Sequence, residues 1–151
     1  MSTDSSTAVP EVTPDRLRTI LDEGRPAEVL DVRPRDQYES WHVPGSRHVG
    51  GYEALKAGEE DIYNDLSLPE DRPVVTVCGA GRTSRMAARQ LRRQGVEAYS
   101  LRGGMRAWTF AWNAAPRQLP EAEVVQLRRT GKGGLSYLVG SGDEALAIDP
   151  S

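Results

Sequence analysis

The stretch "VVTVCGAGRTSRMAARQL" (residues 74–91) decides the fold that we predict for this chain. It begins with a run of apolar and β-branched residues, which is typical of a buried strand. Glycines follow Cys78, and a helical pattern begins near Thr83 or Ser84 and ends at Gly95. The chain's only cysteine is therefore predicted to lie at the C-terminal end of a strand, at the start of a glycine-rich loop.

Strands and helices alternate on both sides of this stretch. One helix is predicted to have Thr13 as its N-cap and Pro14 in its first position. The predicted strands are residues 27–33, 72–77 and 96–101, and the predicted helices are residues 13–24, 84–95 and 103–113. Residues 36–50 form a compact loop in this prediction, and residues 52–68 form short helical pieces. The alternation predicts an α/β fold, in which helices flank a parallel sheet on both faces.

Length and composition limit the classes of protein to be considered. The chain has 151 residues, 38% of them hydrophobic and 27% charged, which fits one domain, or one domain with a fragment of another. The net charge is −3 and the arginines are spread along the chain, so we expect no nucleic-acid partner. We expect a cytoplasmic protein with no membrane partner, because the N-terminus is polar and no run approaches the ~20 apolar residues of a membrane span. Residues 1–10 are predicted to be a disordered tail.

The single cysteine forms no disulfide within the chain and stays a free thiol in a reducing compartment. The loop after Cys78 favours a thiolate, because Gly79 and Gly81 are predicted to adopt positive φ and to turn backbone N–H groups toward one point. The N-terminus of the following helix adds a partial positive charge, and Arg82 and Arg85 add full charges. These features predict a nucleophilic Cys78 with a lowered pKa, whereas the alternative is a small buried apolar residue.

The segment "CGAGRTS" (residues 78–84) resembles the active-site loop of single-domain rhodaneses. The segments "VLDVRPRDQYESWHVPGSRHV" (residues 29–49) and "LRGGMRAW" (residues 101–108) are similar to two further motifs of that family, in the same order. The resemblance covers about residues 12–115 and implies the rhodanese fold. It also implies a sulfurtransferase in which Cys78 carries sulfane sulfur as a persulfide.

The resemblance also implies a role for each residue of the loop. Cys78 would be the catalytic nucleophile, and the substrate-binding residues would be Gly79, Ala80, Gly81, Arg82, Thr83 and Ser84, the last of them at the helix start. The sulfur donor would be thiosulfate or a persulfide. Because the chain has no second cysteine, the acceptor would be an external thiol, or cyanide in an assay. The chemistry requires no metal and no cofactor.

Other residues of these motifs are predicted to be structural. Asp31 and Arg33 are expected to pair with neighbouring loops, and His42 is expected to fix its own turn by hydrogen bonds. Trp108 and Trp112 are four residues apart on the predicted helix, so they are expected to lie on one face and to pack there.

Two alternatives to an autonomous sulfurtransferase are left open. Cysteine phosphatases with a similar loop place an arginine six residues after the cysteine, but that position is Ser84 in this chain and the arginine is Arg82. This difference disfavours phosphatase and arsenate-reductase chemistry. The second alternative is a non-autonomous sulfur-carrier or regulatory module that serves a metallohydrolase or persulfide dioxygenase.

Residues 118–151 form an extension beyond the rhodanese-like domain, which is predicted over residues 11–117. In this extension, "LSYLV", the turn "GSGD" and "ALAIDP" predict a β-hairpin. Residues 123–151 resemble the first strands of metallo-β-lactamase-fold proteins, which implies an incomplete second domain and a possible partner of that fold. No histidine follows His48, so that family's metal-binding histidine cluster is missing. The alternative is a hairpin that packs on the first domain or on another subunit.

Overall fold

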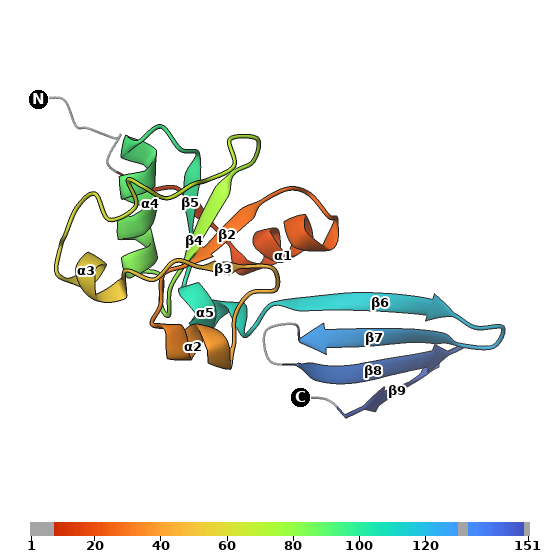
Figure 1. Ribbon diagram of the computed structural model, residues 1–151. Helices are drawn as coiled ribbons and strands as arrows, with labels where there is room; N and C mark the ends of the chain where they lie inside the picture. Colours follow the sequence, from red (N-terminus) through yellow and green to blue (C-terminus); the bar gives the residue numbers. More distant parts are fainter. Residues whose placement is uncertain (1–7, 130–132, 150–151) are drawn as a thin grey trace, which may run out of the picture. The chain divides into compact units, whose positions relative to one another are not determined.

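The computed structural model of the chain describes residues 8–129 and 133–149. It divides into two compact units, residues 1–108 and residues 109–151, and each unit contains one β-sheet (Figure 1).

The first unit contains a five-stranded sheet in which all neighbouring strands are parallel, in the order β1-β5-β4-β2-β3. Its strands are β1 (Glu11–Val12), β2 (Glu28–Asp31), β3 (Arg47–His48), β4 (Val74–Val77) and β5 (Ala98–Leu101). Its helices are α1 (Pro14–Asp22), α2 (Arg35–Ser40), α3 (Tyr52–Lys56), α4 (Thr83–Arg93) and α5 (Gly104–Trp108).

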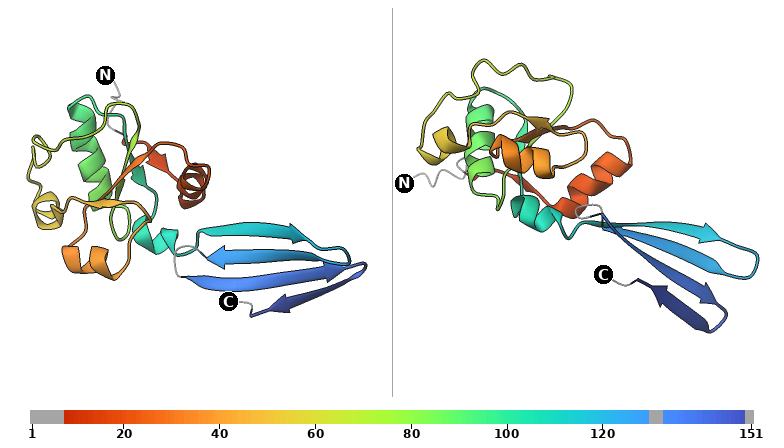
Figure 2. Two further views of the ribbon diagram at one scale, coloured as in Figure 1. Left: turned by 45° about the vertical axis from the view of Figure 1, so that its right-hand side comes forward. Right: turned by 60° about the horizontal axis from the view of Figure 1, so that its bottom comes forward.

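Helices cover both faces of this sheet, as the two views of Figure 2 show. On one face, Val74 of β4 belongs to a buried cluster that includes Leu55 of α3 and Leu91 of α4. On the other face, Val75 of β4 lies opposite Ile20 of α1. The alternation of side chains along β4 therefore supplies two apolar layers, and the predicted parallel sheet flanked by helices is confirmed.

The ends of the helices follow from local sequence. Thr13 Oγ1 accepts a hydrogen bond of 3.2 Å from the backbone N–H of Arg16, and Pro14 occupies the first position of α1. Gly95 has a φ of +85° and lies just after α4. The predicted cap of α1 and the predicted limits of α4 are confirmed to within two residues.

Two segments of the first unit contain more regular structure than predicted. Residues 36–50 are not a loop, because α2 and β3 fall largely within them. The predicted tail at residues 1–10 falls mostly on residues 1–7, which lie outside the described residues. Its last residue, Pro10, accepts a hydrogen bond of 3.0 Å from the backbone N–H of Ser100, so the chain joins the sheet edge earlier than expected.

The second unit is a four-stranded antiparallel sheet in the order β6-β7-β8-β9. Its strands are β6 (Trp112–Gln118), β7 (Glu123–Arg129), β8 (Gly134–Ser141) and β9 (Glu144–Ile148). The predicted hairpin is present as β8 and β9, but it is half of a larger sheet.

The helix predicted over residues 103–113 is wrong in its second half. Helix α5 ends at Trp108, and Trp112 is the first residue of β6, so the two tryptophans do not share a helix face. Strand β6 pairs with β7 at seven successive positions, and this pairing outweighs the local helical spacing. Across the residues that the structure describes, no helix has the length and apolar character that would let it cross a membrane.

Candidate active site

Cys78 follows β4 directly, at the C-terminal edge of the parallel sheet. The position before it is fixed in the sheet, because the backbone N–H of Val32 donates to the carbonyl oxygen of Val77 over 2.9 Å. The cysteine itself is 2% exposed. Ligands of such sheets bind beyond the C-terminal ends of the strands, so the thiol lies where this fold places its chemistry.

Two groups of the loop contact the Cys78 sulfur directly. The backbone N–H of Gly81 donates to Sγ over 3.0 Å, and Ser84 Oγ lies 3.2 Å from Sγ. Burial alone raises the pKa of the thiol, but the hydroxyls of Ser84 and Thr83 and the backbone N–H groups of Ser84 and Ala80 outweigh it. The pKa of Cys78 is therefore below its ordinary value, as predicted.

The two hydroxyls of the loop differ in their surroundings. Ser84 is fully buried, and its Oγ also lies 2.8 Å from Ser100 Oγ on β5. Thr83 is 6% exposed, and within the described chain its Oγ1 forms no hydrogen bond of standard geometry. Ser84 is therefore held on two sides, whereas the Thr83 hydroxyl is available to a further group at the thiol.

The loop turns at one of its two glycines. Gly81 has a φ of +91°, as predicted, and a Cβ atom there would lie 3.0 Å from the backbone nitrogen of Gly103. Gly79 was predicted to share this conformation, but its φ is not positive, and a Cβ atom would meet nothing within 4 Å. Gly81 is thus the loop residue with a positive φ, and the next residue, Arg82, is the N-cap of α4 in the right-handed helical conformation.

The start of α5 forms the back of the loop. The backbone N–H groups of Met105 and Arg106 donate to the carbonyl oxygens of Cys78 and Gly79 over 2.8 and 3.0 Å. Gly104 allows this approach, because a Cβ atom there would collide with the Cys78 carbonyl oxygen. Because these two carbonyl oxygens face α5, the backbone N–H groups of the loop can point toward the sulfur.

The two arginines near the thiol have different environments. Arg85 Nε donates to the carbonyl oxygen of Gly81 over 3.0 Å, and its Nη1 lies 3.5 Å from Glu11 Oε1. Arg82 is exposed at the N-terminus of α4. The groups that lower the Cys78 pKa are hydroxyls and backbone N–H groups, and neither arginine is among them. The structure thus does not support the prediction that arginine charge activates the thiol.

The three residues that we predicted to be structural, Asp31, Arg33 and His42, each form hydrogen bonds within residues 31–42. Arg33 Nη2 donates to Asp31 Oδ2 and to the carbonyl oxygen of Trp41, over 2.7 Å in each case. His42 Nδ1 lies 2.8 Å from the carbonyl oxygen of Tyr38, and the two rings stack. These contacts agree with the structural roles that we expected. Asp31 and Arg33 were expected to pair with neighbouring loops, but they also bind each other.

Sequence reasoning missed Ser100, Thr76 and His48. Thr76 Oγ1 donates to the backbone carbonyl oxygen of Ser84 over 2.7 Å. His48 Nε2 lies 2.7 Å from the carbonyl oxygen of Arg33. Polar side chains at inward positions of two adjacent strands, Thr76 and Ser100, were the available signal in the sequence.

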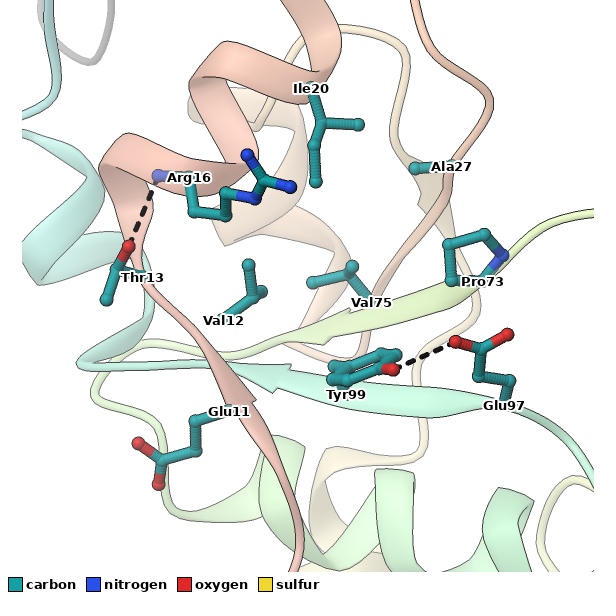
Figure 3. Close-up of a pocket in the computed structure, with 10 residues that line it drawn as sticks. All are labelled: Glu11, Val12, Thr13, Arg16, Ile20, Ala27, Pro73, Val75, Glu97 and Tyr99. Atoms are coloured by element: carbon teal, nitrogen blue, oxygen red, sulfur yellow. Dashed lines mark hydrogen bonds between the residues drawn. The ribbon is translucent and has the colours of Figure 1, made fainter.

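A groove of the first unit lies away from the thiol loop. It has a volume of about 410 Å³ between α1 and the sheet, with Ile20, Val75 and Tyr99 among its lining residues (Figure 3). No residue of the loop 78–84 lines it. Among the residues that the structure describes, no group of three or more His, Cys, Asp or Glu side chains is arranged to hold a metal ion.

Comparison with known proteins places this thiol loop in a family. The family model described as the Rhodanese-like domain matches residues 13–111. The putative sulfur carrier protein YrkF of Bacillus subtilis is 31% identical over 109 residues, which cover 72% of this chain and 55% of that protein. The thiosulfate sulfurtransferase GlpE of Pseudomonas paraeruginosa is 32% identical over 104 residues, which cover 68% of this chain and 86% of GlpE.

A solved structure agrees with these matches. The crystal structure of a rhodanese-like domain protein from Staphylococcus aureus aligns with a TM-score of 0.55 and 25% identity, over 66% of this chain and 90% of that protein. The chain spans about half of the length of YrkF, so what that whole protein does is not transferred. The family match ends at residue 111, and the resemblance of residues 123–151 to the metallo-β-lactamase fold is not confirmed.

Proposed function

The chain belongs to the rhodanese-like domain family, and we propose on this basis that it transfers sulfane sulfur through a persulfide on Cys78. The observation that carries the proposal is the buried Cys78 thiol, whose pKa is lowered by hydroxyl and backbone N–H groups of its own loop. A cysteine that served only as a small apolar residue would need none of these donors.

The first half of the reaction loads the cysteine. The Cys78 thiolate attacks the outer sulfur of thiosulfate, a bond forms between the two sulfurs, and sulfite leaves with the electron pair of the broken bond. The product is an anionic persulfide on Cys78. Charge and atoms balance without a metal or an oxidant, because each sulfur–sulfur bond that forms replaces one that breaks.

The loop offers separate groups to the two sulfur atoms. Gly81 N–H and Ser84 Oγ contact the inner sulfur, which is Cys78 Sγ. The Thr83 hydroxyl helps to lower the Cys78 pKa but forms no hydrogen bond of standard geometry within the described residues, and we assign it to the outer sulfur once the persulfide has formed. The exposed Arg82 is assigned to the anionic donor, which it attracts by charge without acting on the Cys78 pKa.

The second half of the reaction needs an acceptor from outside. Since Cys78 is the only cysteine, no second thiol of this chain can resolve the persulfide. An external thiolate or cyanide attacks the outer sulfur, takes it, and releases the Cys78 thiolate.

A sulfur-carrier function is the second candidate, and the match to YrkF, a protein named as a putative sulfur carrier, favours it. Such a carrier would load its persulfide once and release the sulfur to a partner protein. The metallo-β-lactamase-fold partner predicted from residues 123–151 is one candidate acceptor.

Mass spectrometry after incubation with thiosulfate tests the proposal. The wild type is expected to gain the mass of one sulfur atom, and Cys78→Ala is expected to gain none. An adduct that persists in Cys78→Ala would overturn the proposal, and so would a wild type that stays unmodified.

Turnover separates the two candidates. With excess thiosulfate and a small thiol, an autonomous enzyme releases sulfite continuously, whereas a carrier releases one equivalent and then stops. Arg82→Ala is the companion variant: it is expected to lower kcat/KM for thiosulfate several-fold and to leave the alkylation of Cys78 unchanged.

A further inference from the structure

The contacts behind the thiol loop single out one residue of a neighbouring strand. Ser100 lies on β5, and its Oγ is 2.8 Å from Ser84 Oγ, which is in turn 3.2 Å from Cys78 Sγ. Ser84 and Ser100 are both fully buried. The three groups form a hydrogen-bonded series that runs from β5 to the sulfur.

Ser100 is held in the sheet between two neighbouring strands, β1 and β4. Its backbone N–H donates to the carbonyl oxygen of Pro10 over 3.0 Å, and Ser100 is the register partner of Thr76 on β4. The backbone position from which its side chain projects is therefore fixed. In the part of the chain that the structure describes, the hydrogen-bond partner of its hydroxyl is Ser84.

The number of hydroxyl protons limits the directions that the hydrogen bonds between Ser100, Ser84 and Cys78 can take. A serine hydroxyl has one proton to donate and two lone pairs that accept. When Ser100 donates to Ser84 and Ser84 donates to the thiolate, both hydroxyl protons have an acceptor. When the thiol instead donates to Ser84 and Ser84 donates to Ser100, the buried Ser100 proton is left without an acceptor among the described residues, which costs free energy.

We propose that Ser100 is a positioning residue: its hydroxyl donates to Ser84 Oγ and thereby directs the Ser84 proton at the Cys78 sulfur. Donation by Ser100 also polarises the Ser84 hydroxyl and strengthens the bond to the thiolate. Ser100 touches neither Cys78 nor substrate in this arrangement and acts through Ser84 alone. The inference deepens the proposed function by adding a group that prepares the same thiol.

The test is the pH profile of Cys78 alkylation by iodoacetamide, which follows the thiolate without any sulfur transfer. Ser100→Ala is expected to shift the profile upward by about one pH unit, which lowers the rate up to about tenfold below the midpoint. Ser136→Ala is the matched control. Ser136 is another buried serine, and its hydroxyl donates to the carbonyl oxygen of Asp149 in the second unit. It is expected to leave the profile unchanged.

A double-mutant cycle tests the route of the effect. In a Ser84→Ala background, Ser100→Ala is expected to add no further shift, because the hydroxyl through which it acts is gone. Ser100→Thr retains a hydroxyl and is expected to keep most of the wild-type profile, and it serves if Ser100→Ala does not fold. An unchanged profile in Ser100→Ala, an equal shift in the Ser84→Ala background, or a fully shifted Ser100→Thr would each overturn the inference.

The outcomes also separate this inference from the proposed function. A shifted profile in a protein that never gains sulfur from thiosulfate would sustain the role of Ser100 and refute the sulfurtransferase. Normal persulfide formation with an unchanged Ser100→Ala profile would do the reverse.

Discussion

Strand β4 of the parallel sheet in the first unit and strand β9 of the antiparallel sheet in the second unit have opposite exposure. All four residues of β4 are buried, whereas all five residues of β9 are exposed. Helices cover the parallel sheet on both faces (Figure 2). The buried sheet can hold polar side chains such as Thr76 and Ser100 at fixed positions, since no solvent competes for their hydrogen bonds. Strand β9 has no buried position that could hold a side chain in this way, and the thiol site lies at the end of the buried β4.

The largest expected difference concerns a strand carboxylate in each sheet. Asp31 on β2 is fully buried and accepts hydrogen bonds from the backbone N–H and the guanidinium of Arg33. Asp31→Ala leaves the buried Arg33 charge without its partner and is expected to lower the free energy of unfolding of the first unit by about 3 to 5 kcal/mol. Glu144→Ala on the exposed β9 is expected to change that of the second unit by less than about 0.5 kcal/mol.

Hydrogen exchange across a urea series gives the free energy of each unit separately and measures both variants. Equal effects in the two units would contradict the contrast between the sheets.

The next difference concerns one leucine in each sheet. Leu30 on β2 is 1% exposed, and Leu146 on β9 is 60% exposed. Leu30→Ala is expected to lower the free energy of unfolding of the first unit by about 2 to 5 kcal/mol, because it removes packed atoms and leaves a cavity. Leu146→Ala is expected to cost less than about 1 kcal/mol. A large effect of Leu146→Ala in the same urea series would show that β9 is covered in solution.

The smallest difference concerns two glycines with positive φ. Gly81 has a φ of +91° with Gly103 N near its missing Cβ, whereas Gly142 has a φ of +58° and open space around it. Gly142→Ala is expected to cost about 1 kcal/mol from the left-handed conformation alone. Gly81→Ala is expected to cost about 1 to 3 kcal/mol and also to slow Cys78 alkylation, since the N–H of Gly81 contacts the sulfur. Alkylation at the wild-type rate in Gly81→Ala would refute the contribution of this turn to the thiol.

The fold of the first unit could be predicted because its signals are local. Thr13 with Pro14 marks the start of a helix, and the run before Cys78 marks a buried strand. The first half of the antiparallel sheet could not be predicted, because β6 includes Pro116, Arg117 and Gln118 and shows no regular alternation of apolar residues. Its strand conformation depends on pairing with β7, which no local pattern reveals.

The site divides in the same way. The loop from Cys78 to Ser84 is contiguous in sequence, and its turn at Gly81 and the lowered pKa of the thiol follow from residue types. Ser100 is distant in sequence from Cys78, and its position behind the loop follows only from the pairing of β4 with β5. Arg82 shows the converse limit, because its proximity in sequence suggested a charge effect on the thiol, and Arg82 is not among the groups that lower the Cys78 pKa.

The close approach of Gly104 to the loop has a consequence for protein engineering. The carbonyl oxygens of Cys78 and Gly79 accept hydrogen bonds from the backbone N–H groups of Met105 and Arg106. A side chain at position 104 would collide with the loop and prevent this contact. A graft of the seven residues "CGAGRTS" into another scaffold would therefore leave these carbonyls unbound and the loop without its support. A graft that keeps both strands, helix α4 and the two glycines before Met105 has to include at least the segment from Val74 to Arg106.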